Sequence, residues 1–356
     1  MKLNEYIDIT SLNDLVEAGM INEIPHPTAN LVMYNYSKEC QVVGCWNDTT
    51  KKCRGLIVDI FGDIVARPMS KFFNYEEYVQ SETLDMIPAN ESFEVYEKLD
   101  GSLGILYWVG DKPFITTKGS FVSEQGEHAT RLLHTKYKDV WNRLDRSLTY
   151  MFEIIYPDDP HIVRYNDLDD IFLIAIQDTN NPSNVVSLDG YSDIFNVVRK
   201  YDNVEDWSKV RENIDGTNRE GFVIKFESGF RLKLKYEEYT KLHYMKHHLT
   251  PKRILDYTIE GKLDELQDIW KEFDEESRLY YDGIVEDLNT LFRTIYQDMD
   301  VEHREDFSSR KDAAMYYLTC KYPSLHFARA FGNEKKLDSL IWKEVRKRLR
   351  DEDKIQ

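Results

Sequence analysis

A change of pattern near residues 245–255 constrains the fold of this 356-residue chain most. Before it, short apolar segments alternate with polar or glycine-bearing turns, which is typical of β-strands joined as hairpins. Three such turns are Gly62-Asp63, Gly110-Asp111 and Ser228-Gly229. The sequence therefore predicts a largely antiparallel sheet, with strands at 30–36, 53–60, 64–68, 92–99, 104–109, 113–119, 150–156, 161–165, 171–178, 221–226 and 230–235.

Helical signals are few before this change and dominate after it. Apolar residues at helical spacing predict a helix within 124–144, and another is expected at 189–201. From residue 250 onward the chain shows helical patterns with acidic exposed faces. We therefore expect an α+β protein, with an N-terminal antiparallel-sheet domain, 1–248, followed by a smaller all-α C-terminal domain, 249–356.

Charge and cysteine usage narrow the classes of protein. The formal net charge of −18 argues against a protein that coats nucleic acid by bulk electrostatics, so any such site must be local. We find no apolar leader at the N-terminus and no run as long as a membrane span. The spacings of Cys40, Cys45, Cys53 and Cys320 match no zinc template, so we expect reduced thiols in a cytoplasmic protein.

Charged residues stand at several predicted strand ends. In "GFRLKLKYEEY", alternation places Arg231, Lys233 and Lys235 on one face, where a solvated edge strand is the simpler alternative to a binding site. Glu153 in "TYMFEIIY" and Glu220 in "NREGFVIKF" lie in or beside apolar runs. A carboxylate is costly to bury unless something binds it, although a ladder end or a loop junction would also accommodate one.

Lys98, in "EKLDGSLG", ends a predicted strand and is either a turn lysine or a nucleophile. Arg54, Lys71 and Lys118 are further cations at strand ends or beside glycine. Clustered cations with two carboxylates suit a nucleoside triphosphate and its divalent metal ion. The phosphate-binding motifs of P-loop and Rossmann proteins are absent from the sequence.

The ordered series of motifs adds a resemblance to a known family. Lys98-Leu99-Asp100-Gly101, Phe152-Glu153, Glu220-Gly221 and Lys233-Leu234-Lys235 together resemble the covalent nucleotidyltransferases, which comprise ATP-dependent DNA ligases, RNA ligases and capping enzymes. Residues 30–245 are most similar to the RNA ligase 1 family of T-even bacteriophages. The segments that carry this similarity are "YNY", "CRGLIVD", "ARPMSKFFN", "KLDGSL", "TKGSFVSEQ", "FEIIYPDDPHIV" and "KYEEYTKLH".

This resemblance implies an ATP-dependent RNA ligase that joins 5′-phosphate and 3′-hydroxyl RNA ends through lysyl-AMP and adenylylated RNA, in RNA or tRNA repair. It makes Lys98 the nucleophile, gives Lys233 and Lys235 catalytic roles, and assigns Mg²⁺ or Mn²⁺ to Glu220 and Glu153. The implied nucleotide contacts are Tyr34, Arg54, Lys71, Lys118, Glu153, Glu220, Lys233, Lys235 and Tyr239. A free lysine has a pKa of about 10.4, so we expect neighbouring cations and the metal ion to favour the neutral amine of Lys98.

The family also implies partners. We expect an RNA-binding monomer, located in the host cytoplasm if the protein is viral, that relies on a separate polynucleotide kinase-phosphatase. A nicked tRNA anticodon loop is one candidate target. Two basic stretches, 231–253 and 335–350, are either RNA-contacting or solvated. In the second, Leu337, Leu340, Ile341, Val345 and Leu349 form an apolar stripe at helical spacing.

Two other functions stay open. One is a DNA ligase or capping-type nucleotidyltransferase on the same core. Leu103 argues against it, because those enzymes usually carry arginine there. The other is a non-catalytic module that binds nucleotide or RNA.

Overall fold

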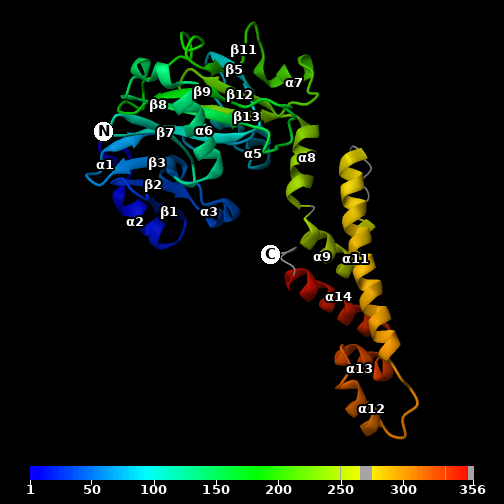
Figure 1. Cartoon of the computed structure of the whole chain (residues 1–356). Helices are drawn as coiled ribbons and strands as arrows, with labels where there is room; N and C mark the ends of the chain where they lie inside the picture. Colours follow the sequence, from blue (N-terminus) through cyan, green and yellow to red (C-terminus); the bar gives the residue numbers. More distant parts are fainter. Residues whose placement is uncertain (249, 265–274, 333, 352–356) are drawn as a thin grey trace. The chain divides into compact units, whose positions relative to one another are not determined.

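The computed structural model describes residues 1–248, 250–264, 275–332 and 334–351 (Figure 1). The chain divides into two compact units, Met1–Thr240 and Lys241–Gln356. All strands in the described residues belong to the first unit, and the described elements of the second are helices. The protein is therefore of the mixed α+β class with antiparallel sheets, as the sequence predicts.

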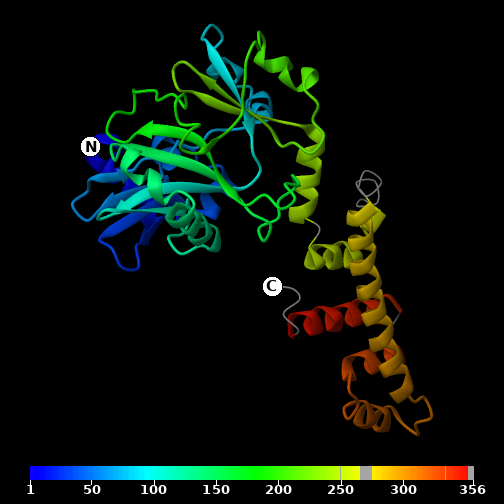
Figure 2. The same ribbon diagram turned by 45° about the horizontal axis from the view of Figure 1, so that its top comes forward.

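The first unit contains three sheets, which Figure 2 shows from a second direction. The first has the order β1 (Ile21–Pro25), β2 (Leu31–Tyr36), β3 (Arg54–Asp59), β4 (Ile64–Ala66). The second has the order β10 (Asn196–Val197), β9 (Asp170–Asp178), β8 (Leu148–Ile155), β6 (Ser102–Val109), β7 (Lys112–Thr117). The third has the order β11 (Lys200–Tyr201), β5 (Phe93–Lys98), β12 (Gly221–Phe226), β13 (Arg231–Lys235).

Hairpins build most of this arrangement. The three predicted turns connect β3 to β4, β6 to β7 and β12 to β13, and each of these strand pairs is antiparallel. Gly62, Gly110 and Gly229 in these turns have φ of 78°, 59° and 85°, a backbone conformation that favours glycine. The short β9–β10 pair is parallel, so the sheets are largely antiparallel, as predicted.

Helices of the first unit are mostly short and lie in connections. Helix α6 (Glu124–Thr135) packs Ala129 and Leu133 onto the apolar face of the second sheet, beside Phe152 and Ile154 of β8. The remaining helices are α1 (Leu3–Tyr6), α2 (Ile9–Glu17), α3 (Lys38–Val43), α4 (Asp48–Lys52), α5 (Tyr75–Gln80) and α7 (Val210–Asn213), with 3₁₀ turns at Leu84–Met86, Lys138–Arg143 and Trp207–Lys209.

Three predicted elements differ from the structure. The segment 161–165 is not a strand, because the backbone N–H groups of Ile162 and Val163 bond to the carboxylate of Asp100 instead of to a neighbouring strand. The segment 189–201 is not a helix, because Gly190 has φ of 82° in a turn and β10 and β11 follow it. The helix within 124–144 ends at Thr135, and a 3₁₀ turn follows.

The second unit has its own apolar core. Its described helices are α8 (Glu237–His248), which begins in the first unit, α9 (Pro251–Glu260), α11 (Glu275–Glu302), α12 (Arg310–Tyr317), α13 (Pro323–Phe331) and α14 (Glu334–Asp351). The predicted stripe of α14 is confirmed, since Leu337, Ile341, Val345 and Leu349 are buried in this core and Leu340 packs against it. Amongst the described residues, no helix is long and apolar enough to cross a membrane.

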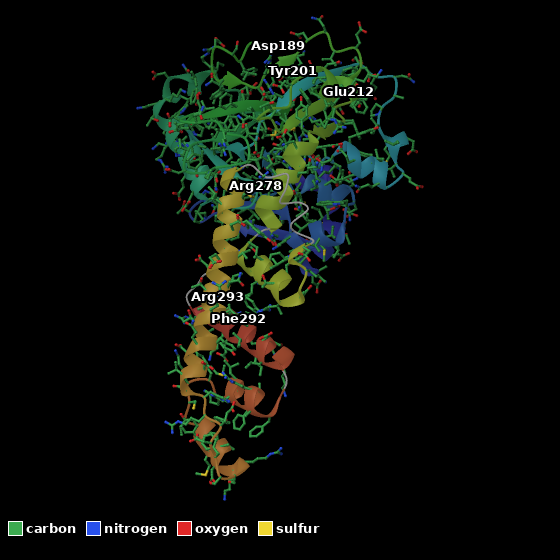
Figure 3. The ribbon with its side chains drawn as sticks, turned by 90° about the vertical axis from the view of Figure 1, so that its right-hand side faces the viewer. Asp189, Tyr201, Glu212, Arg278, Phe292 and Arg293 are labelled. Carbon is green, nitrogen blue, oxygen red and sulfur yellow. The ribbon has the colours of Figure 1, made fainter. Side chains whose placement is uncertain are left out.

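The long helix α11 illustrates how sequence patterning builds this core. Phe292 packs its ring against Trp342 of α14, with ring centroids 4.6 Å apart. Its neighbour Arg293, labelled beside it in Figure 3, pairs instead along the helix with Glu286, at 3.2 Å. Successive residues thus point about 100° apart around the helix, so one reaches the core while the next stays at the surface.

Candidate active site

Lys98 lies at the end of β5, directly opposite Gly221 of β12 in the sheet register. Gly221 has φ of 146°, and a Cβ there would lie 2.2 Å from the carbonyl oxygen of Leu234, so only glycine fits. This close approach of β12 to β13 places Glu220 between Lys98 and Lys235. The motif Glu220-Gly221 is therefore required by strand geometry as well as by charge.

Glu220 bridges the two lysines. Its Oε2 lies 2.8 Å from Nζ of Lys98, and its Oε1 lies 2.9 Å from Nζ of Lys235. Glu220 is only 2% exposed, so both ion pairs are shielded from water. Removing the carboxylate would break both ion pairs in a largely buried position.

The environment of Lys98 corrects one expectation from the sequence. Burial alone would lower the pKa of Lys98, but Glu220, Glu153 and Asp100 outweigh burial and raise it. The prediction that neighbouring cations favour the neutral amine is therefore wrong for the protein without ligands, because the nearby carboxylates contribute more.

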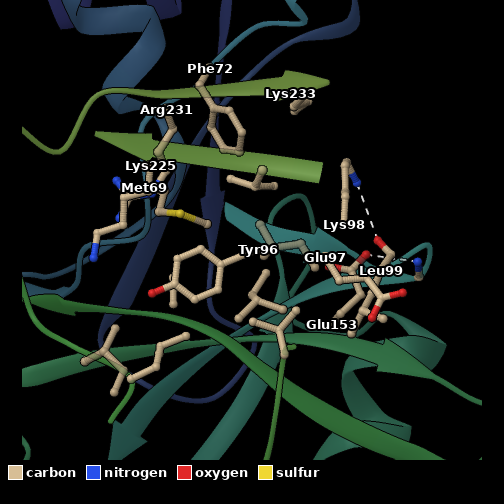
Figure 4. A pocket seen from close by; sticks show the side chains of 18 of the residues that line it. Met69, Phe72, Tyr96, Glu97, Lys98, Leu99, Glu153, Lys225, Arg231 and Lys233 are labelled. Carbon is tan, nitrogen blue, oxygen red and sulfur yellow. Dashed lines mark hydrogen bonds between the residues drawn. The ribbon is translucent and has the colours of Figure 1, made fainter. Parts of the chain in front are cut away.

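A pocket of about 250 Å³ opens beside Lys98. In Figure 4, Lys98 and Glu153 lie at one side of it, and Met69, Lys225 and Arg231 lie at the other. Residues of its lining that come from the predicted site are Arg54, Lys98, Lys118, Glu153 and Lys233. Apolar side chains line the rest, among them Met69, Phe72, Leu103, Ile174 and Val223.

Glu153 is a buried carboxylate on a central strand. It pairs with Leu103 of β6 and accepts a hydrogen bond of 2.9 Å from the backbone N–H of Gly101. A Cβ on residue 101 would lie 2.5 Å from the carbonyl oxygen of Ile154, so glycine is needed for this approach. Burial raises the pKa of Glu153 to about 7, with Lys98 opposing the shift.

Lys233 is held among other cations. Burial, followed by the charges of Lys71, Lys98, Arg54 and Lys235, lowers the pKa of Lys233 well below its ordinary value. Its Nζ lies 4.9 Å from the ring centroid of Phe72, a weak substitute for a counter-ion. The solvated edge-strand alternative therefore does not describe Lys233, although β13 does lie at the edge of its sheet.

The other three cations gather around Tyr36. Lys118 donates a hydrogen bond of 2.9 Å to the hydroxyl of Tyr36. Burial opposes ionisation of Tyr36, but Lys118, Arg54 and Lys71 together lower its pKa. Lys71 has a lowered pKa, first because it is buried and also because Arg54 and Lys118 repel its charge. An anion bound here would relieve this repulsion.

The two predicted tyrosines have different surroundings. The hydroxyl of Tyr34 donates to Glu23 at 3.1 Å, and its ring packs against the cluster of Leu3, Leu12 and Cys53. The structure thus does not bring Tyr34 to the cations. Tyr239 at the start of α8 lies near Lys98, because it donates 2.8 Å to Oδ1 of Asp100.

Sequence analysis missed the structural role of Asp100. Its Oδ2 accepts from the N–H groups of Ile162 and Val163, at 2.9 and 3.0 Å, and its Oδ1 accepts from Tyr239. Asp100 therefore joins the end of β5, the segment after β8 and the start of α8 into one wall. The Lys-x-Asp-Gly motif marked this residue, but nothing in the sequence identified its partners. Tyr36 was also missed, although the "YNY" segment contains it.

The residues present fit a divalent metal ion. Glu153 and Glu220 offer carboxylate oxygens on the side of the pocket that holds Lys98. Such hard oxygen donors beside a phosphate site suit Mg²⁺ or Mn²⁺.

Comparison of whole structures identifies the class of fold. The chain matches an archaeal ATP-dependent RNA ligase with a TM-score of 0.53 at 12% identity, over 96% of this chain and 95% of that one. A second form of that ligase gives 0.51 at 13% identity over the same shares. The fold is thus that of the nucleotidyltransferase-type ligases.

Sequence comparison identifies the family. The model of the RNA ligase family matches residues 52–239, and the chain belongs to this family. An RNA ligase of Rhodothermus phage RM378 is 24% identical over 86% of each chain. A protein of Autographa californica nuclear polyhedrosis virus, whose name pairs a polynucleotide kinase with an RNA ligase, is 24% identical over 60% of this chain and 34% of its own length.

Proposed function

We propose that the chain is an ATP-dependent RNA ligase that joins 5′-phosphate and 3′-hydroxyl ends through a lysyl-AMP intermediate on Lys98. The observation that carries this proposal is the gathering of Lys98, Glu153, Glu220 and five cations in and beside one pocket of an RNA ligase family member. Those cations are Arg54, Lys71, Lys118, Lys233 and Lys235.

In the first step, Nζ of Lys98 attacks the α-phosphorus of ATP, a phosphorus–nitrogen bond forms, and the bond to pyrophosphate breaks. Lys98 must first lose a proton, because its pKa is raised in the protein without ligands. Oε2 of Glu220, 2.8 Å from Nζ, is placed to receive that proton. Mg²⁺ or Mn²⁺ held by Glu220 and Glu153 would screen both carboxylates and so make the neutral amine more accessible.

The cations stabilise the charge that moves during this step. Lys233 and Lys235 lie on β13, which β12 separates from the strand of Lys98, and they hold the α-phosphate oxygens. Arg54, Lys71 and Lys118, gathered around Tyr36, hold the β- and γ-phosphates and orient pyrophosphate for departure. Glu153 lines the nucleotide end of the pocket, Tyr239 supports that end through its hydrogen bond to Asp100, and the apolar lining accommodates the base.

In the later steps AMP passes from Lys98 to the 5′-phosphate of RNA, and a 3′-hydroxyl then displaces AMP to form the phosphodiester. Residues 1–248 form the adenylyltransferase domain in this proposal, and the all-α domain 249–356 contributes to RNA specificity. Exposed basic side chains of α14 support that role, among them Lys343, Lys347 and Arg350. Arg346 is committed instead to an ion pair with Asp256.

The substrate ends must come from another activity. The baculovirus relative, named for both a kinase and a ligase, supports a functional link to a polynucleotide kinase-phosphatase. Broken RNA, including a nicked tRNA anticodon loop, is the proposed target of a monomer acting in the cytoplasm of a host cell.

A comparison of nucleotide and nucleic-acid substrates tests this function. Purified protein is incubated with Mg²⁺ and either ATP or GTP, together with 5′-phosphorylated single-stranded RNA or nicked DNA. We expect sealing of RNA with ATP, loss of sealing in Lys98→Ala, and full sealing in Lys112→Ala, a matched change at an exposed lysine of β7. Sealing of nicked DNA alone, or use of GTP alone, would favour the DNA ligase or capping alternative.

A further inference from the structure

Three side chains able to bind a metal ion converge in the second unit, away from the pocket already described. Glu302 is the last residue of α11, Cys320 follows α12, and His326 lies in α13 (Figure 1). One ligand atom from each lies within 4.8 Å of the other two. Nε2 of His326 is 3.6 Å from Oε2 of Glu302.

His326 has an unusual environment for a histidine. Its side chain is completely buried, and within the described residues no partner of its Nε2 lies at hydrogen-bond distance, since Oε2 of Glu302 is just beyond it at 3.6 Å. A buried polar atom without a partner destabilises a protein, so a native structure that keeps one calls for an explanation. Nε2 is directed to the side where Glu302 and Cys320 also offer ligand atoms.

A neighbouring histidine sets the form in which His326 can bind a metal ion. Nδ1 of His326 and Nδ1 of His303 are 3.1 Å apart, so one of them carries the hydrogen. If His326 donates, its Nε2 keeps a free lone pair, and Nε2–H of His303 points toward Glu305, whose Oε1 is 4.0 Å away. This is the arrangement that metal-bound histidines usually show, with the second nitrogen donating to a partner.

The other groups are also held in place. The rings of His303 and His326 lie within 7° of parallel to each other, and within 7° and 10° of the ring of Tyr317. Oε2 of Glu302 accepts 2.9 Å from the backbone N–H of Lys321. The thiol of Cys320 makes a weak hydrogen bond of 3.6 Å to the carbonyl of Tyr316, which a metal–sulfur bond would replace.

We propose that Glu302, Cys320 and His326 form a Zn²⁺ site, with a water molecule in the fourth position. Thiolate and imidazole are donors that favour Zn²⁺ over Mg²⁺ or Mn²⁺. In a tetrahedral zinc site, whose bonds to nitrogen, oxygen and sulfur are about 2.0–2.3 Å long, ligand atoms lie about 3.5 Å apart. The distance between Glu302 and His326 meets this condition already, and Sγ of Cys320, which lies within 4.8 Å of both, comes closer by a side-chain adjustment.

This ion would add to the hydrogen bonds and ion pairs that already join three elements of the second unit. It links the end of α11 to the turn after α12 and to α13, around the long loop at 303–309. Because the ligands come together only in the folded unit, binding of the metal ion adds to the stability of that unit. The site is separate from the Mg²⁺ or Mn²⁺ of the ligation reaction.

Cobalt substitution tests the site directly. Full-length protein is stripped with a chelator under reducing conditions and titrated with Co²⁺ in excess Mg²⁺. We expect one Co²⁺ per chain, with a thiolate-to-cobalt charge-transfer band and the visible bands of a tetrahedral site. One equivalent of Zn²⁺ should displace the Co²⁺ and abolish both sets of bands. A spectrum without the charge-transfer band would overturn the proposal, and this result needs no variant.

Variants provide the matched comparison. Cys320→Ser should remove the charge-transfer band, and His326→Ala should weaken Zn²⁺ binding by more than the roughly tenfold that loss of a hydrogen-bond partner of a ligand costs. Cys45→Ser, a half-buried cysteine of the first unit, should leave both unchanged. Circular dichroism checks that each variant is folded. Equal Zn²⁺ binding by folded Cys320→Ser and Cys45→Ser would also refute the site.

Discussion

Replacing Glu153 by glutamine should stabilise the protein at alkaline pH while it abolishes adenylyl transfer. Burial raises the pKa of Glu153 from 4.5 to about 7. The folded state therefore binds a proton that the unfolded state has released, so stability falls as pH rises between these two values. Because one pKa unit corresponds to ~1.36 kcal/mol, ionised Glu153 costs about 3 kcal/mol above pH 7.

Glutamine has the shape of the protonated side chain and cannot ionise. At pH 5 the free energies of unfolding of Glu153→Gln and the wild type should therefore differ by less than about 1 kcal/mol. At pH 8, without metal ion or nucleotide, the variant should be more stable by about 3 kcal/mol. Adenylyl transfer by the variant should be lost, because the neutral amide of glutamine lacks the negative charge with which a carboxylate binds the metal ion.

Urea unfolding at pH 5, 6, 7 and 8, followed by tryptophan fluorescence, measures this difference. Glu127→Gln on the exposed face of α6 is the matched control and should change stability by less than about 0.5 kcal/mol at every pH. If Glu153→Gln and the wild type lose stability in parallel between pH 5 and 8, the buried carboxylate is not the source of the pH dependence, and the reasoning fails.

Three further changes test the pocket by urea unfolding and by the yield of lysyl-AMP. Gly221→Ala places a Cβ 2.2 Å from the Leu234 carbonyl oxygen, so we expect at least about 2 kcal/mol of destabilisation and little adduct; normal behaviour would exclude the tight strand approach. Tyr239→Phe removes the bond to Asp100 and should cost about 1–2 kcal/mol, whereas an unchanged midpoint would mean that this bond contributes nothing. Lys233→Met removes a buried cation with a depressed pKa, so it should gain about 1–2 kcal/mol at pH 7 yet lose adduct; lower stability would contradict the repulsion described.

Local patterns in the sequence were sufficient for the elements that bury one face. Alternation in β13 correctly placed Arg231, Lys233 and Lys235 on one face, opposite the buried Leu232 and Leu234, and the glycine turns correctly placed three hairpins. The strand predicted at 161–165 is wrong. Its apolar alternation is that of a strand, but the backbone N–H groups of Ile162 and Val163 donate to the carboxylate of Asp100. That partner lies more than 60 residues away in the chain, and a local pattern cannot reveal it.

The site was predictable in residue type and less so in electrostatics. Motif order indicated Lys98, Glu153, Glu220, Lys233 and Lys235, and the structure brings them together. The sign of the pKa shift of Lys98 was not predictable, because it depends on the competition between burial and three carboxylates. Likewise, Tyr34 and Tyr36 are two residues apart on β2 and would share a face of a regular strand. The register shifts between Tyr34 and Asn35, so only the structure shows that the hydroxyl of Tyr36 is the one that reaches Lys118.

Covalent labelling of Lys98 is the most direct test of the central claim. The protein, first stripped of bound AMP with pyrophosphate, is incubated with ATP and Mg²⁺, and the intact protein and its peptides are weighed by mass spectrometry. We predict the addition of one AMP per chain, located on the peptide that contains Lys98, reversed by pyrophosphate and absent from Lys98→Ala. An adduct on another residue, or a folded protein that never acquires AMP from ATP or GMP from GTP, would contradict the account and leave Lys98 as a structural lysine of a binding module.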